Sequence, residues 1–212
     1  MKMADLQRIL GDQAVFRTGA ILAGQHSPAS VRRQLARWVK AGKVVVLRKG
    51  LYVLAEPYAK QSPHPFVLAN ELRRASYVSL QSALAWYGCI PEFAPATTSV
   101  TTERPEQLDT PKGRFIFRHV KRDLMWGMLR IEVASSQLAL IATPEKALID
   151  LLYLTPDSDR PDYLNELRVE PAGKLQLGVV SEMAERSGSN KVMRAVKYLE
   201  GLWRESEWEA LQ

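Results

Sequence analysis

Residues 27–54 constrain the fold more than any other part of the chain. Ser27 and Pro28 are typical of a helix start, because the serine oxygen accepts an orphan amide proton and proline has no amide proton to leave unpaired. A helix over residues 28–40 then gathers one apolar face from Val31, Leu35, Trp38 and Val39. Two β-rich runs, at 44–47 and 51–54, surround a turn that contains Gly50 and predict a hairpin.

Two shorter helices are expected before this segment. Residues 2–10 form an amphipathic pattern that Gly11 ends, and residues 18–23 form a second helix, followed by a short turn at 24–26. The order helix, helix, turn, helix, hairpin is that of a winged helix-turn-helix, whose last helix enters the major groove of DNA. We therefore predict a winged helix-turn-helix DNA-binding domain over residues 1–54.

The charge of the chain is concentrated in this same segment. Residues 1–54 carry ten Lys and Arg against two acidic residues, a net charge of +8. Residues 55–212 carry nineteen Lys and Arg against twenty-one acidic residues, a net charge of −2. Such an asymmetry indicates a polyanion-binding module joined to an ordinary globular domain.

The face of the 28–40 helix opposite its apolar side supplies the candidate DNA contacts. Arginine can donate two hydrogen bonds to guanine, so Arg33 and Arg37 are the main candidates for reading bases. Ser30 and Gln34 are weaker candidates for the same role. The candidates for phosphate contacts, which position the protein without reading sequence, are Arg17, Thr18, Arg32, Lys40, Arg48 and Lys49.

The remainder of the chain is expected to be a linker and a second domain. Residues 55–65 contain three prolines, which oppose both helix and central strand, so we expect a linker there. Residues 66–212 are expected to form a mixed α+β C-terminal domain, which makes the whole chain α+β. Its expected helices are 65–74, 80–87, 145–153 and a mainly helical tail over 176–211, and its expected strands are 97–102, 114–120 and 128–133.

We expect no catalytic site, no metal site and no cofactor. Cys89 is the single cysteine and has apolar neighbours, which predicts a buried thiol. The three histidines have no ligand-like spacing, and Asp157-Ser158-Asp159 lies in a polar turn flanked by prolines. No stretch reaches the roughly 20 apolar residues of a membrane helix, and the first residues are amphipathic rather than signal-like. A cytoplasmic protein that is not an enzyme is therefore expected.

Four motifs in order resemble the AbiEi family, the antitoxins of type IV toxin–antitoxin systems. They are RKGLY (48–52), SYVSLQSALAWYG (76–88), FIFRHV (115–120) and ATPEKALIDLLYL (142–154), so the resemblance runs to about residue 155. The residues that match the family's pattern are Ser79, Gln81, Ser82, Ala83, Leu84, Pro144, Glu145, Lys146 and Ala147. We expect mainly packing roles for them, since most are small or apolar and an acid suits a helix start.

The resemblance implies a function in two parts. Family members bind inverted repeats in their own promoter with the winged helix and repress the operon, which implies two copies per operator on double-stranded DNA. The C-terminal domain is linked to neutralising a nucleotidyltransferase toxin, without a required stable complex. Two alternatives stay open, a C-terminal domain that senses a small ligand and one that binds a protein partner through Trp86, Trp126, Trp203 and Trp208.

Overall fold

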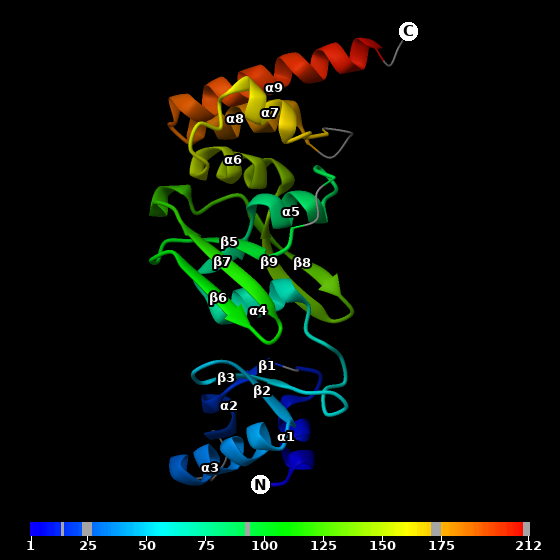
Figure 1. The fold of residues 1–212 in the computed structure, drawn as a ribbon, viewed down its shortest axis with the longest axis vertical. Helices are drawn as coiled ribbons and strands as arrows, with labels where there is room; N and C mark the ends of the chain where they lie inside the picture. The colour runs from blue at the N-terminus through cyan, green and yellow to red at the C-terminus, as the bar shows by residue number, and fades with distance from the viewer. Residues whose placement is uncertain (14, 23–26, 92–93, 171–174, 210–212) are drawn as a thin grey trace.

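The structure is a computed structural model that describes residues 1–13, 15–22, 27–91, 94–170 and 175–209, with backbone alone for 205–209. Its elements stack along one long axis (Figure 1). Three short helices and a three-stranded sheet lie at one end, a six-stranded sheet lies in the middle, and helices cover the other end. The expected α+β class is confirmed. No described helix is long and apolar enough to cross a membrane.

The N-terminal unit contains the expected helices and hairpin. Its elements are α1 (Met3–Leu10), β1 (Val15–Arg17), α2 (Thr18–Leu22), α3 (Pro28–Lys40), β2 (Val44–Arg48) and β3 (Leu51–Leu54). Strand β1 was not predicted, because three residues are too few to show an alternating pattern. It pairs with β3, and the rings of Phe16 and Tyr52 stack with their centroids 5.6 Å apart. The turn expected at 24–26 lies outside the described residues.

Strand β3 is buried on both faces. Leu54, together with Val44 of β2, packs against the helices of the N-terminal unit, in a core that also holds Trp38. Leu51 and Val53 point the other way and belong to the core of the C-terminal unit. Because successive strand residues face opposite sides, one short apolar strand serves two cores.

Residues 55–64 connect the two units and contact the N-terminal unit. The carbonyl of Tyr58 accepts a hydrogen bond of 2.9 Å from the Gln7 side chain. The ammonium of Lys60 lies 2.8 Å from the Asp12 carboxylate. The prolines thus prevent regular structure here without preventing contacts, and α4 begins at Pro65, the last residue of the expected linker.

The C-terminal unit is built on a mixed sheet with strand order β6-β7-β5-β4-β9-β8. The pairs β5–β7 and β4–β9 are parallel, and the other pairs are antiparallel. Helix α4 lies toward the N-terminal unit, whereas α5 and α6 lie toward α8 and α9 (Figure 1). The elements are α4 (Pro65–Leu72), β4 (Ser76–Val78), α5 (Leu80–Trp86), β5 (Thr97–Thr101), β6 (Glu106–Thr110), β7 (Gly113–His119), η1 (Arg122–Leu124), β8 (Met128–Ala134), β9 (Gln137–Ala142), α6 (Pro144–Leu154), α7 (Pro161–Glu166), α8 (Leu177–Arg186) and α9 (Asn190–Glu209).

The expected strands of this unit are present as β5, β7 and β8, and the expected helices as α4, α5, α6, α8 and α9. Strands β4, β6 and β9 and helix α7 were not predicted. Strand β4 has three residues, and β6 is a polar edge strand with the sequence EQLDT. Both lack the apolar alternation that identifies a strand in sequence, because their place in the sheet is set by their neighbours.

Candidate nucleic-acid interface

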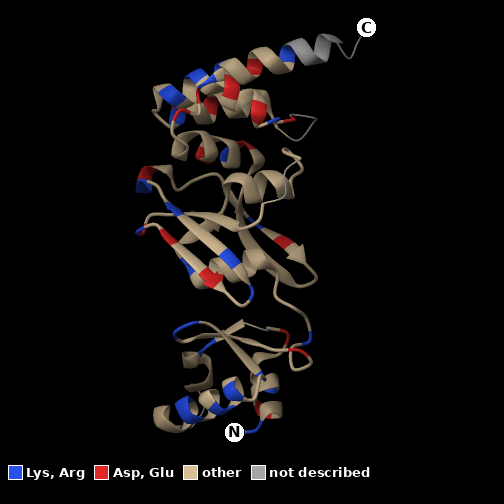
Figure 2. Cartoon of the chain, in the orientation of Figure 1, with Lys and Arg blue, Asp and Glu red and all other residues tan. Residues whose placement is uncertain are grey.

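The outward face of α3 presents the cations that the sequence predicted there. Val31, Leu35 and Trp38 are almost fully buried beneath it, and Val39 is half-buried. Helix α3 lies at the end of the molecule farthest from the six-stranded sheet, and cations follow its length (Figure 2). The exposed cations of this helix are Arg32, Arg33, Arg37 and Lys40.

The polar side chains near the start of α3 differ in how available they are. The Ser30 hydroxyl donates a hydrogen bond of 2.8 Å to the carbonyl of Ser27, so its proton is already used by the helix start. Gln34 is half-buried and, with Arg37 and Met1, borders a shallow hollow of about 100 Å³. At this end of α3 the Gln34 and arginine side chains are therefore more available to a ligand than the Ser30 hydroxyl.

Among the described residues, no acidic side chain pairs with the cations of this face. Of the ion pairs found between described residues, none includes a cation of α3. The same holds for Lys49, which is exposed at the hairpin tip. A group of like charges without internal partners raises the local potential and attracts a polyanion.

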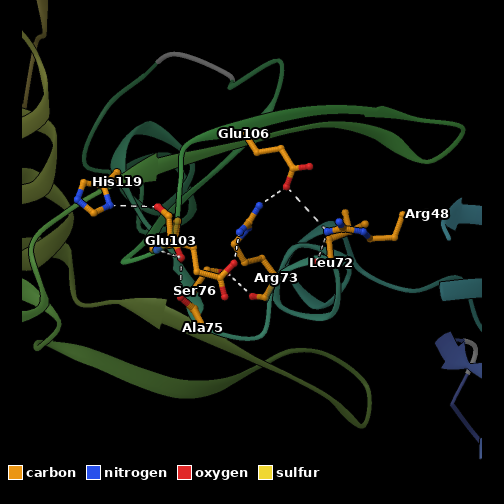
Figure 3. Close-up of polar contacts among 9 residues, drawn as sticks. Arg48, Leu72, Arg73, Ala75, Ser76, Glu103, Glu106 and His119 are labelled. Carbon is orange, nitrogen blue, oxygen red and sulfur yellow. Dashed lines mark hydrogen bonds and ion pairs between the residues drawn. The ribbon is translucent and has the colours of Figure 1, made fainter. Parts of the chain in front are cut away.

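Arg17 and Arg48 do not lie as expected. The Arg48 guanidinium turns toward the C-terminal unit, where its Nη1 donates to the carbonyl of Leu72 at 3.1 Å and lies 3.8 Å from a Glu106 oxygen (Figure 3). Arg17 donates to the carbonyl of Glu71, and its Nε lies 3.4 Å from the carboxylate of the same residue. In this structure both guanidinium groups therefore contact the C-terminal unit. The sequence did not reveal this because the partners lie far along the chain.

Thr18 also differs from the expectation. Its amide, the first of α2, donates a hydrogen bond of 3.2 Å to the carbonyl of Gly50 in the hairpin turn. The first amide of α2 is therefore already paired within the N-terminal unit. Lys49 is exposed and forms no ion pair with a described residue, which makes it the most available candidate outside α3.

The start of α3 is capped as predicted, and this cap gives a stability prediction. The Ser27 Oγ accepts from the Ser30 amide at 3.3 Å. Ser27→Ala is expected to lower the free energy of unfolding by about 1 kcal/mol, whereas Ser27→Gly should cost only a few tenths. Urea unfolding of the three proteins followed by circular dichroism measures both changes. Equal stability of the alanine and wild-type proteins would show that this cap contributes nothing.

Most of the motif residues at 79–84 and 144–147 lie in the interior. The ammonium of Lys146 forms an ion pair with Asp150 one turn further along α6, and neither side chain is exposed by more than about 2%. Asp150 also accepts from the Tyr77 hydroxyl at 2.8 Å and from the Ser79 hydroxyl at 2.7 Å. The Lys146 ammonium lies 4.6 Å from the centre of the Trp126 ring. These five residues, the buried polar cluster, tie α6 to β4 and to the start of α5.

Electrostatics explain why the members of the cluster depend on one another. Burial lowers the pKa of Lys146 and raises the pKa of Asp150, while the contact between the two opposes both shifts. Burial and the neighbouring Asp150 carboxylate raise the pKa of Tyr77, which keeps its hydroxyl protonated as a donor. A charge here is tolerated only beside its partner.

The other motif residues also hold elements together. The Ser82 hydroxyl donates to the carbonyl of Ala96 at 3.1 Å and accepts from the amide of Thr98 at 2.8 Å, which fixes α5 against β5. The Glu145 carboxylate accepts from the amide of Gln176 at 3.1 Å. The side chains of Ser79, Ser82, Ala83, Leu84, Glu145, Lys146 and Ala147 are buried, and Gln81 is half-buried. This is the packing role that the sequence suggested.

The remaining candidates from the sequence are placed as follows. Cys89 is buried, as expected. Asp159 accepts a hydrogen bond of 2.7 Å from Arg194, and the Ser158 hydroxyl donates to the carbonyl of Leu152. Within the described residues, no group of three or more His, Cys, Asp or Glu could hold a metal ion.

The tryptophans named as partner anchors are mostly engaged inside the protein. Trp203 is buried and donates to the carbonyl of Val169 at 2.9 Å. The Trp126 ring is half-buried beneath Lys146 and Arg186. Trp86 is 41% exposed, and the side chain of Trp208 lies outside the described residues.

Comparison with known proteins supports the fold. No protein-family model and no curated protein matches the chain. The crystal structure of the Rv2827c protein from Mycobacterium tuberculosis is similar, with a TM-score of 0.55 and 14% sequence identity. The match covers 93% of this chain and 74% of that one. At this identity the likeness concerns the fold alone, and the chain shares the fold of Rv2827c over nearly its whole length.

Proposed function

We propose that the protein is a DNA-binding transcriptional autorepressor of the AbiEi antitoxin type. The observation that carries this proposal is the outward face of α3, where exposed cations lie opposite a buried apolar face and form no ion pair with any described residue. A helix that is capped, packed through its apolar face against the core and lined with exposed arginines is suited to the major groove of DNA.

The roles of the cations follow from their positions. Arg33 and Arg37 are one helical turn apart, so both reach the same groove, and each guanidinium can donate to two acceptors of one guanine. Arg32, Lys40 and Lys49 flank them and are suited to phosphate contacts, which set the position on the duplex. Sequence preference then resides mainly in two arginines.

The finer parts of the proposal derive from the resemblance. Two copies bind inverted repeats in the promoter of the protein's own operon, and the C-terminal unit neutralises a nucleotidyltransferase toxin without a required stable complex. The protein acts in the cytoplasm, is not an enzyme and needs no metal or cofactor. Co-expression of the full chain with a nucleotidyltransferase encoded by a neighbouring gene tests this part. The full chain should restore growth to cells in which that nucleotidyltransferase stops growth. Growth arrest despite normal expression of the folded protein would contradict the antitoxin role.

Fluorescence anisotropy with a labelled upstream DNA fragment tests the DNA-binding role. The full chain should bind this fragment more tightly than an unrelated fragment of equal length. The affinity should fall as the salt concentration rises, because each neutralised phosphate releases counterions. Equal affinity for both fragments at every salt concentration would contradict sequence-specific repression.

A second candidate function is a regulator that responds to a small ligand. A cavity of about 320 Å³ lies between the two units, and side chains of both line it, among them Asp12, Gln13, Glu71 and Arg130. This volume falls within the range of small-molecule pockets. If this candidate is right, a small-molecule fraction of cell extract should change the DNA affinity of the wild type. The same fraction should not act on Val67→Trp, in which the new ring fills the cavity.

A further inference from the structure

The end of helix α4 receives two arginines from the other unit. The helix ends at Leu72, and its last carbonyls have no donor within the helix. Arg17 donates to the carbonyl of Glu71, and Arg48 donates to that of Leu72. Cations are favourable at a helix C-terminus, because the carbonyl ends carry partial negative charge. The N-terminal unit thus caps a helix of the C-terminal unit.

Two carboxylates complete this contact. Glu71 lies beside Arg17, and Glu106 of β6 lies beside Arg48. Glu106 is itself held by Arg73 (Figure 3). The Arg73 guanidinium lies 5.4 Å from the centre of the Phe117 ring, and the Arg73 side chain is only 12% exposed. The acceptor for Arg48 is therefore positioned by its own unit. We name Arg17, Arg48, Glu71, Glu106 and the Leu72 carbonyl the arginine clasp.

We propose that the arginine clasp stands in for DNA phosphates and withholds Arg17 and Arg48 from DNA. A carboxylate and a phosphate present similar oxygen acceptors to a guanidinium, so both compete for the same donors. The clasp lowers the affinity for DNA of any sequence and leaves recognition to α3. This inference rests on the proposed DNA-binding function and adds to it a contact with the C-terminal unit that lowers the affinity for DNA.

The geometry indicates that the clasp can be opened without separating the units. Its ion pairs are half-exposed, with 3.4 and 3.8 Å between the nitrogen and oxygen atoms, and such pairs contribute little to stability. The units are joined beside it by buried apolar side chains, including Leu47, Leu51 and Val53. Removal of the two carboxylates should therefore weaken the hold on the arginine side chains, which keep only the backbone carbonyls as acceptors. Arg73 keeps Glu103 as its partner when Glu106 is replaced, so the fold should stay intact.

The test uses the full chain and the double variant Glu71→Gln/Glu106→Gln. The slope of log affinity against log salt changes by about 0.9 for each phosphate contact on duplex DNA. The double variant should steepen the slope by about 0.9 to 1.8 and bind unrelated DNA several-fold more tightly at low salt. Arg17→Ala/Arg48→Ala should leave the wild-type slope unchanged. The matched control is Glu166→Gln/Glu185→Gln, which removes the same charge at exposed positions of α7 and α8.

Two results would contradict the proposed role of the arginine clasp. One is a Glu71→Gln/Glu106→Gln slope equal to that of the matched control. The other is a shallower slope for Arg17→Ala/Arg48→Ala, which would mean that these arginines already contact DNA. Elution from a heparin column gives a readout that does not need an operator, and the glutamine variant should elute at higher salt than its control. A heparin shift without specific promoter binding would retain the clasp and reject the repressor proposal. Urea unfolding confirms that each variant is folded.

Discussion

Replacing Arg33 and Arg37 together with alanine is expected to weaken promoter binding by about 2–4 kcal/mol, or roughly 30- to 1,000-fold. Each arginine offers a fork of donors on the exposed face of α3, and no acidic neighbour among the described residues competes for it. The loss should be larger on the promoter fragment than on unrelated DNA, because base contacts carry the sequence preference. Fluorescence anisotropy on both fragments measures this difference.

Two controls separate base reading from charge. Lys121→Ala/Arg122→Ala removes two exposed cations of the C-terminal unit and should leave promoter binding unchanged. Arg32→Ala/Lys40→Ala should weaken binding to both fragments by a similar factor, as expected for phosphate contacts. If the Arg33/Arg37 variant bound the promoter like the wild type, α3 would not be the recognition helix.

The second large effect concerns stability. Lys146→Met is expected to lower the free energy of unfolding by about 3–5 kcal/mol, because it leaves Asp150 buried without its cation. The methionine replaces most of the lysine chain, so the loss reports the missing charge more than a cavity. Urea unfolding at pH 7 measures it. The double variant Lys146→Met/Asp150→Leu should recover part of the loss, since it removes both charges.

The two single variants should respond to pH in opposite directions. In Lys146→Met the pKa of Asp150 stays raised in the folded state, so its stability should be greater at pH 5 than at pH 8. In Asp150→Asn the pKa of Lys146 stays lowered, so its stability should rise from pH 6 to pH 9 as the lysine loses its proton. Parallel pH profiles for the two variants would show that lost packing, not buried charge, causes the destabilisation.

Local sequence was enough to predict α3, its cap and its exposed face. The determinants of that helix are the Ser27–Pro28 start and the spacing of four apolar residues, all within one segment. The start of α6 has the same arrangement, a Thr143–Pro144 pair that local sequence also shows, and the Thr143 oxygen accepts from the Lys146 amide at 3.2 Å. Structural features that depend only on neighbouring residues were therefore predicted correctly from the sequence.

Features that depend on distant partners were not recovered. Arg48 has the sequence context of a wing residue, yet its partners are contributed by α4 and β6. Strand β1 exists because β3 offers a pairing edge, and its own three residues carry no pattern. A signal for the buried polar cluster was present, since Lys146 and Asp150 are spaced by four in a helix whose other residues after Lys146 are apolar. Such spacing marks a pair that can meet one turn apart.

Because β3 belongs to two cores, the N-terminal unit cannot easily be joined to a different C-terminal domain. A winged helix that closes its own core can be moved to another chain as a module. Here the isolated first 54 residues would expose Leu47, Leu51 and Val53 to water, and the remainder would lose part of its covering. Loss of either half should therefore promote aggregation of the other, and both halves should unfold in one cooperative transition. Fusion proteins or gene rearrangements that separate them at residue 54 are expected to be insoluble unless the new neighbour supplies an apolar surface of matching shape.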